Sequence, residues 1–298
     1  MSRQDTDDRK STDDRKSTDG PLQNGQRPGS ERAQGGIDGE ALVEIDGLTK
    51  IYDPGGADVL AVDGLDLDIG HNEFVCLLGP SGCGKSTVLE CIAGYLGPTE
   101  GEVRVDGERV RDPDPSRGVV FQENRLFPWK TIGENARFGP QMRSAVDDDR
   151  IEELLGDTGL DGFEDAYPHE LSGGMQQRAE LVRLLANDPD IMLMDEPFSG
   201  LDAMTKELMQ EMLLDIWEEE SRTVLFITHD VEEAIFLADR VVVMTARPGE
   251  VKEVIDVDLE RPREFDMVTT EEFTSYKERA IDLIHDEAER AMAQAEGQ

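Results

Sequence analysis

The sequence predicts an α/β fold built on a mainly parallel core sheet. Five short, almost continuous apolar runs are each followed by a polar residue, a pattern typical of strands buried on both faces. They occupy residues 74–78, 119–121, 191–194, 224–227 and 241–244, and predicted helices at 204–220 and 231–239 separate the later ones. Open sheets of this kind bind ligands at the carboxyl ends of their strands. The residues that follow these runs are therefore the functional candidates.

The chain ahead of this sheet divides into two parts. Residues 1–39 contain a six-residue repeat, at 6–11 and 12–17, followed by Gly, Pro, Gln and Asn. Such a composition offers little apolar surface to offset the entropy of ordering, so these residues are predicted to be a disordered tail. Order is expected to begin near Ala41 with a strand, and residues 103–110 predict a hairpin that turns at Asp106-Gly107.

The acidic charge lies in the folded part of the chain. The formal net charge is −37 over 298 residues, and the first 39 residues contribute only −1 of it. A polyanion such as nucleic acid is therefore excluded as the main partner. Carboxylates are spread along every predicted helix and only eight residues are Lys, which favours a halophile surface over that of an ordinary acidic protein.

Neither a membrane span nor a metal cluster is predicted from the composition. No apolar run reaches the roughly 18 to 20 residues that cross a bilayer, and the N-terminus lacks a signal-peptide pattern, so the chain is expected in the cytosol. Cys76, Cys83 and Cys91 have neither zinc-ligand spacing nor an even number for a disulfide framework. Cys83 is predicted to be the reactive thiol, because a helix N-terminus and Lys85 would favour its thiolate.

A glycine-rich loop provides the strongest chemical motif. It reads Gly79-Pro80-Ser81-Gly82-Cys83-Gly84-Lys85-Ser86-Thr87, between a predicted strand and a predicted helix. Its backbone N–H groups can surround phosphate oxygens, Lys85 adds a charge near the β and γ phosphates, and Ser86 can bind Mg²⁺. An incidental glycine turn is the alternative, and the flanking strand and helix argue against it.

Two carboxylates end another predicted strand. Asp195 is placed to approach Mg²⁺, usually through water, and Glu196 to activate the water that attacks a γ phosphate. Alone, such a run is more often a strand that leads into a solvated loop. Its meaning here comes from its occurrence together with the glycine-rich loop.

The segment Leu171-Ser172-Gly173-Gly174-Met175, continued by Gln-Gln-Arg, resembles the signature motif of ATP-binding cassette (ABC) ATPases. Tyr52, Gln122, Ser199-Gly200-Leu201-Asp202 and His229 occur in the order of the other family motifs, so the resemblance covers about residues 42–250. It implies a P-loop NTPase cassette at 40–260 with a mainly parallel core sheet, an antiparallel β subdomain and a helical signature subdomain at about 125–185. Residues 261–298 are expected to form a C-terminal helical appendage.

The resemblance also implies roles for these residues. Tyr52 would stack on adenine, Gln122 would sense Mg²⁺ and the γ phosphate, and His229 would reach the same phosphate. The signature residues would bind the ATP of an opposite subunit, and Asp202 would cross the same interface, in a homodimer that encloses two ATP molecules. Without the family, Tyr52 would be a half-buried strand residue, Gln122 a strand cap and His229 a structural histidine.

The chain resembles the importer cassettes of the nitrate, sulfonate and taurine group most, because Phe127-Pro128-Trp129 follows Gln122. These three residues are expected to receive a coupling helix of a membrane permease; the alternative is that Phe127 and Trp129 fill the local core. The group implies separate permease subunits, an extracellular solute-binding protein, and a peripheral place on the cytoplasmic side of the cell membrane. Ser199-Gly200 replaces the group's usual Gly-Ala, and cassettes for thiamine precursors share much of the pattern.

Two other functions compete with the importer. A soluble ABC ATPase of DNA repair or translation is disfavoured by the single cassette and by the lack of a basic face or a long coiled-coil insertion. A small-molecule kinase leaves the signature motif unexplained. The imported solute cannot be read from a subunit that does not touch it.

We expect folding and ATPase activity to require high KCl or NaCl. The 36 excess negative charges after residue 39 repel one another, and salt shortens the screening length from about 30 Å at 0.01 M to about 3 Å at 1 M. Melting temperatures measured between 0.1 and 3 M KCl should rise with salt. A melting temperature that does not change over this range would exclude the halophile hypothesis.

Overall fold

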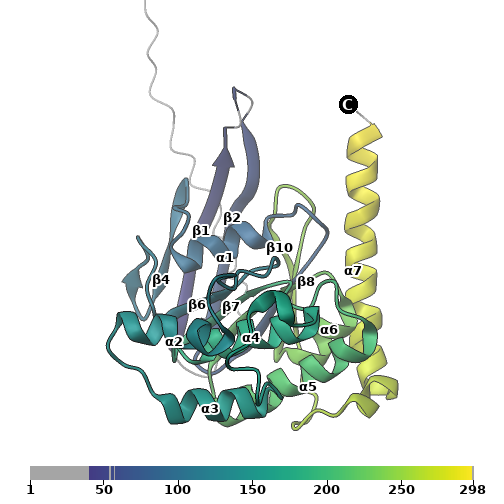
Figure 1. Cartoon of the computed structure of the whole chain (residues 1–298). Helices are drawn as coiled ribbons and strands as arrows, with labels where there is room; N and C mark the ends of the chain where they lie inside the picture. Colours follow the sequence, from purple (N-terminus) through teal and green to yellow (C-terminus); the bar gives the residue numbers. More distant parts are fainter. Residues whose placement is uncertain (1–39, 54, 57, 297–298) are drawn as a thin grey trace, which may run out of the picture. The chain divides into compact units, whose positions relative to one another are not determined.

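The computed structural model describes residues 40–296 except residues 54 and 57 (Figure 1). The predicted disordered tail at 1–39 lies outside the described residues. The central sheet has the order β10-β9-β3-β8-β7-β6, and all its neighbours are parallel except the antiparallel pair β10 and β9. Its strands are β3 (Phe74–Leu78), β6 (Arg117–Val120), β7 (Ile191–Asp195), β8 (Thr223–Thr228), β9 (Arg240–Met244) and β10 (Val251–Asp256). The predicted α/β class with a mainly parallel sheet is confirmed.

A second, antiparallel sheet has the order β2-β1-β4-β5. Its strands are β1 (Ala41–Tyr52), β2 (Val59–Gly70), β4 (Glu100–Val105) and β5 (Glu108–Arg109). Asp106 and Gly107 connect β4 to β5 with φ of 51° and 71°, the left-handed pair that suits a two-residue hairpin. The predicted hairpin is therefore confirmed.

Seven α-helices are present in the described part of the chain, and Figure 1 labels each of them. They are α1 (Lys85–Ala93), α2 (Ile132–Met142), α3 (Asp148–Asp157), α4 (Gly173–Leu185), α5 (Ala203–Glu220), α6 (Val231–Leu237) and α7 (Glu271–Glu296), with 3-10 turns at Pro168–Glu170 and Phe265–Thr269. Helices α2, α3 and α4 lie between β6 and β7, within the range expected for a helical subdomain.

Both faces of the central sheet are covered by apolar side chains. In β3, Phe74, Cys76 and Leu78 join one buried cluster and Val75 and Leu77 join another. Alternate residues of a strand point to opposite faces, so this strand is buried on both sides. Burial on both faces explains why the sequence of β3 is continuously apolar.

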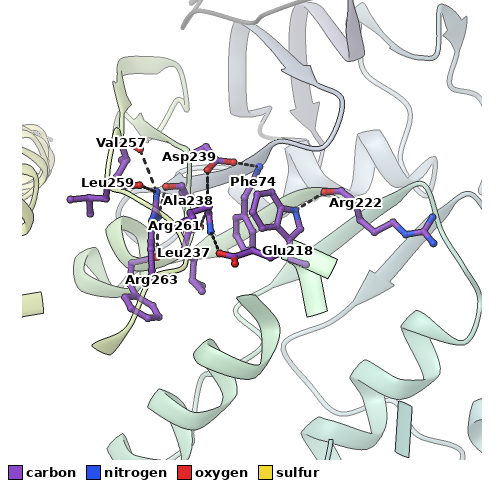
Figure 2. A network of polar contacts seen from close by, with 12 residues as sticks. Phe74, Glu218, Arg222, Leu237, Ala238, Asp239, Val257, Leu259, Arg261 and Arg263 are labelled. Atoms are coloured by element: carbon purple, nitrogen blue, oxygen red, sulfur yellow. Dashed lines mark hydrogen bonds and ion pairs between the residues drawn. The ribbon is translucent and has the colours of Figure 1, made fainter. Parts of the chain in front are cut away.

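The segment after β10 is fixed to the core by two arginines (Figure 2). Buried Arg263 donates to the carbonyls of Ile235, Phe236, Ala238, Val257 and Leu259 at 2.8 to 3.5 Å, and burial, with Arg261 nearby, lowers its pKa to about 10. Arg261 donates to Asp239 at 2.7 Å and lies 4.2 Å from the Trp217 ring centroid. From the following helix α7, Phe273 and Ala280 join the core cluster.

The sequence predicted the helical appendage but gave no role to Arg263. We expect Arg263→Lys to lower the free energy of unfolding by about 2 to 4 kcal/mol, because one ammonium has three donors and cannot serve five buried carbonyls. Denaturant unfolding at constant salt measures this loss. Arg279→Lys is the matched control, since Arg279 is exposed and pairs with Glu253, and it should change stability by less than about 0.5 kcal/mol. Equal losses in both variants would contradict the assignment.

Candidate functional site

The glycine-rich loop connects β3 to α1 and turns tightly against its neighbours. Gly82 and Gly84 have φ of 77° and 100°, and a Cβ at Gly84 would lie 2.9 Å from the carbonyl oxygen of Ala61. Both conditions favour glycine. Lys85, the first residue of α1, is buried, and its ammonium donates to the carbonyls of Gly79 at 2.8 Å and Pro80 at 3.1 Å.

This loop forms one wall of a cavity of about 430 Å³. The cavity brings together residues from β1, β2, the glycine-rich loop and the segments after β6, β7, β8 and β9. Its lining consists of Tyr52, Val59, Ala61, Ser81, Gly82, Gly84, Lys85, Ser86, Thr87, Gln122, Glu196, His229 and Arg247. A larger cavity of about 720 Å³ is lined by Arg109, Arg117 and Arg222 among others, and includes none of the predicted site residues.

Three predicted residues meet at one carboxylate oxygen. Oε2 of Glu196 accepts a hydrogen bond from Gln122 Nε2 at 3.2 Å and lies 3.1 Å from His229 Nδ1. Gln122 follows β6, Glu196 follows β7 and His229 follows β8, and these strands are consecutive in the sheet. Glu196 has a φ of 45°, a left-handed conformation that is strained for a side chain with a Cβ, and its N–H donates to the carbonyl of Ile227 at 2.9 Å.

Asp195 lies one residue earlier, at the end of β7. Burial raises the pKa of its carboxyl, and Glu196 adds to the rise, while a hydrogen bond from Ser86 and the charge of Lys85 oppose it. The hydroxyl, carboxylate and amide oxygens of Ser86, Asp195 and Gln122 are the hard donors that Mg²⁺ prefers. Among the described residues no three His, Cys, Asp or Glu side chains form a group that could hold a metal ion.

Tyr52 ends β1 at the rim of the cavity. Tyr52 is 37% exposed, and its hydroxyl forms a hydrogen bond of 3.2 Å with Thr87 at the start of α1. The tyrosine is therefore partly accessible next to the glycine-rich loop, an arrangement that permits stacking on a base.

The signature residues do not line this cavity. Ser172 caps α4 by accepting a hydrogen bond from Met175 N, Gly173 and Gly174 begin the helix, and Leu171 is buried. A Cβ at Gly174 would lie 2.8 Å from the Thr205 methyl group, one turn into α5. Asp202 caps α5 by binding Thr205 N and Oγ1 at 3.1 and 2.7 Å, so the signature helix and Asp202 are close together.

Phe127, Pro128 and Trp129 form part of the loop between β6 and α2. Trp129 is 71% exposed, so the alternative that it fills the local core is wrong. The half-buried Phe127 ring packs edge-on against Phe138 with centroids 4.7 Å apart. The loop is held by Asn135, which is fully buried and accepts a hydrogen bond from Phe127 N at 2.8 Å.

Sequence reasoning missed Asn135, Glu180, Arg183 and Arg247. Glu180 is buried on α4 and accepts a hydrogen bond from Arg125 N. Arg183 donates to the Arg125 carbonyl. A charged residue at an interior position of an amphipathic helix was the signal available for Glu180.

The prediction that Cys83 is a reactive thiol is wrong. The Cys83 side chain is 1% exposed, and burial raises the pKa of its thiol although Lys85 and backbone hydrogen bonds act in the opposite direction. Burial likewise raises the pKa of Cys91 to about 11 and that of Cys76 well above its usual range. Loss of solvation outweighs the helix terminus at this position.

Comparison with known proteins gives the family. The ABC transporter family description matches residues 62–199. An uncharacterized ABC transporter ATP-binding protein of Methanocaldococcus jannaschii is 48% identical over 84% of this chain and 94% of its own length. The chain therefore belongs to the ABC transporter ATP-binding proteins, and it is an ATP-hydrolysing subunit.

Two further proteins of the family are similar to this chain. An aliphatic sulfonates import ATP-binding protein, SsuB of Bacillus cereus, is 42% identical over 80% of this chain and 94% of its own length. A dimeric ATP-binding cassette in a post-hydrolysis state with ADP and Pi has a TM-score of 0.65 and 34% identity, and covers 73% of this chain and 100% of its own. No described helix has the length and apolar composition to cross a membrane.

Proposed function

We propose that the chain is the motor subunit of an importer, which couples ATP binding and hydrolysis in a cassette dimer to solute uptake through separate permease subunits. The contact of Gln122 and His229 with the same oxygen of Glu196 carries the proposal, because it assembles the groups needed for hydrolysis beside the glycine-rich loop. Tyr52 receives the adenine, and residues 79–87 receive the phosphates.

Glu196 is the base in this site. Its carboxylate orients water and accepts the proton as the water attacks the γ phosphate. His229 and Gln122 contact Glu196 and can turn toward the phosphate and the metal ion. Lys85 donates hydrogen bonds to two loop carbonyls and can exchange them for hydrogen bonds to phosphate oxygens.

Ser86, Gln122 and Asp195 would hold Mg²⁺. The ion supplies neutralisation of the phosphate charge when it is bound. Burial raises the pKa of Asp195, and a cation bound beside it would favour its charged form.

A homodimer completes the site in this proposal. The start of α4 offers free N–H groups to an anion but lies outside the cavity of its own chain. In a closed C2 dimer, Ser172, Gly173 and Gly174 of one chain would bind a phosphate of the nucleotide held by the other chain. Asp202 would cross the same interface. The solved relative that is dimeric supports this arrangement.

A groove of about 480 Å³ offers a surface for the permease. It is lined by aromatic and aliphatic residues including Tyr95, Phe127, Phe138 and Met142, with Arg183 and Glu180 at its wall. Exposed Trp129 lies beside Phe127, with ring centroids 5.6 Å apart. An amphipathic coupling helix fits such a groove, and the loop leads directly to Gln122.

The sulfonate-import relatives favour a nitrate, sulfonate or taurine-like solute, with an extracellular solute-binding protein and a peripheral place on the cytoplasmic face of the membrane. The alternative, a soluble ABC ATPase of DNA repair or translation, is disfavoured by the net charge of −37 and by the exposed apolar loop. Copurification with permease subunits rather than with nucleic acid would decide between them.

We expect Glu196→Gln to retain Mg-ATP binding and to lose at least about 10² of its turnover, because a positioned general base contributes about 10² to 10⁴ in rate. Phosphate release and nucleotide binding should be measured on the same preparation, together with dimer formation in ATP, which should increase. Lys85→Ala is the comparison and should weaken binding itself. Hydrolysis by Glu196→Gln at the parental rate would exclude Glu196 as the base.

We expect Trp129→Ala to weaken permease association while the isolated cassette keeps its melting temperature within about 1 °C and its basal ATPase rate. The ring is largely exposed in the isolated chain, so its truncation removes little packing, whereas a large aromatic at an interface often contributes 2 kcal/mol or more. Tyr167→Ala is a matched control on another exposed aromatic. Unchanged permease affinity in a pull-down would contradict the coupling role.

A further inference from the structure

The turn between β9 and β10 lies against the glycine-rich loop. The backbone of Gly249 is so near this loop that an added Cβ would meet the Cys83 carbonyl oxygen. Gly249 also donates to the Ala61 carbonyl at 2.8 Å and accepts from Asp63 N at 3.1 Å. The turn is therefore fixed to both the glycine-rich loop and β2, which form two walls of the nucleotide cavity.

This turn brings Arg247 to the cavity. Its Nη2 lies 3.6 Å from the position of a Cβ on Gly82, and its side chain lines the cavity together with Ser81 and Lys85. Arg261 and Arg263, by comparison, bind a carboxylate and a backbone carbonyl. In the described part of the chain the Arg247 guanidinium has no such partner, and Lys85 is the other permanent cation of the lining.

Helix α7 holds the same turn from behind. Buried Glu287 accepts a hydrogen bond from Ala246 N at 3.1 Å, next to Arg247. Its other oxygen lies 3.0 Å from Lys252 Nζ and 2.8 Å from Arg290 Nη1. Lys252 also donates to the Leu283 carbonyl at 2.7 Å, so β10, α7 and the turn form one connected group.

We propose that Arg247 is a further phosphate-binding cation of the nucleotide site, and that Glu287 of α7 is the residue that positions it. The inference rests on the proposed nucleotide site. In a chain with a net charge of −37, a polyphosphate needs local cations to overcome the repulsion of the surrounding carboxylates. An arginine provides several donors and stays charged at every working pH. The C-terminal helix thereby becomes part of the nucleotide site rather than only a cover for the core.

The test is nucleotide affinity of the full chain at one fixed salt concentration. We expect Arg247→Ala to weaken ATP and ADP binding about tenfold, as for the loss of a charge-assisted hydrogen bond, and AMP binding clearly less. Arg247→Lys should restore part of the affinity. Binding is measured under conditions that keep the chain monomeric, so that effects on dimer closure do not enter.

Glu287→Ala tests the positioning role. It should weaken ATP binding in the parent but have no additional effect in the Arg247→Ala background, because it acts through Arg247. Glu289→Ala, an exposed carboxylate two residues along α7, is the matched control and should leave affinity unchanged. Additive losses of affinity from Glu287→Ala and Arg247→Ala would show that Glu287 does not act through Arg247 and would overturn the positioning role.

The outcomes separate this inference from the proposed function. If the parent binds ATP and Lys85→Ala does not, but Arg247→Ala binds as the parent does, the nucleotide site stands and Arg247 has no part in it. If Arg247→Ala impairs only dimer formation, the arginine faces the second cassette and the inference is likewise wrong. A parent chain that binds no ATP at all would overturn both.

Discussion

The parallel register of four neighbouring strands is the constraint on which the site depends. Leu78 of β3 pairs with Thr228 of β8, Ile227 of β8 pairs with Asp195 of β7, and Met194 of β7 pairs with Val120 of β6. The strands therefore end at nearly the same level. Each of the segments that follow, from the glycine-rich loop to Glu196, Gln122 and His229, begins at this edge. A shift of one residue in any pair would turn a strand's side chains to the opposite face and separate these groups.

Packing of the core stabilises this arrangement, and several residues of the site destabilise it. Glu196 has a left-handed backbone, Lys85 is buried, and Asp195 is partly desolvated next to another carboxylate. The left-handed backbone of Glu196 costs about 1 to 3 kcal/mol and persists where the surroundings fix it. Here β3, β7 and β8 are almost fully buried on both faces, so the edge cannot relax without loss of packing.

Two polar connections join elements that are distant in the chain. Glu180 and Arg183 of α4 bind the backbone of Arg125, so the helix that begins with the signature motif also holds the loop after Gln122. On the other side, Arg261 and Arg263 fix the segment before α7 to the ends of α6 and β10 (Figure 2). In both connections charged side chains bind backbone groups. A buried backbone group without a hydrogen-bond partner would be costly in free energy.

The sequence by itself determined five strands of the central sheet, the hairpin at Asp106-Gly107 and the motif residues, because apolar runs, left-handed turn residues and glycine-rich loops are local patterns. Only the tertiary structure decided that Trp129 is exposed and that the Cys83 thiol is buried and keeps its proton. It also decided that Asn135, Glu180, Arg247 and Glu287 contribute to loops near the site. Burial and the partners of a polar side chain depend on segments far away in the chain, so no local pattern contains them.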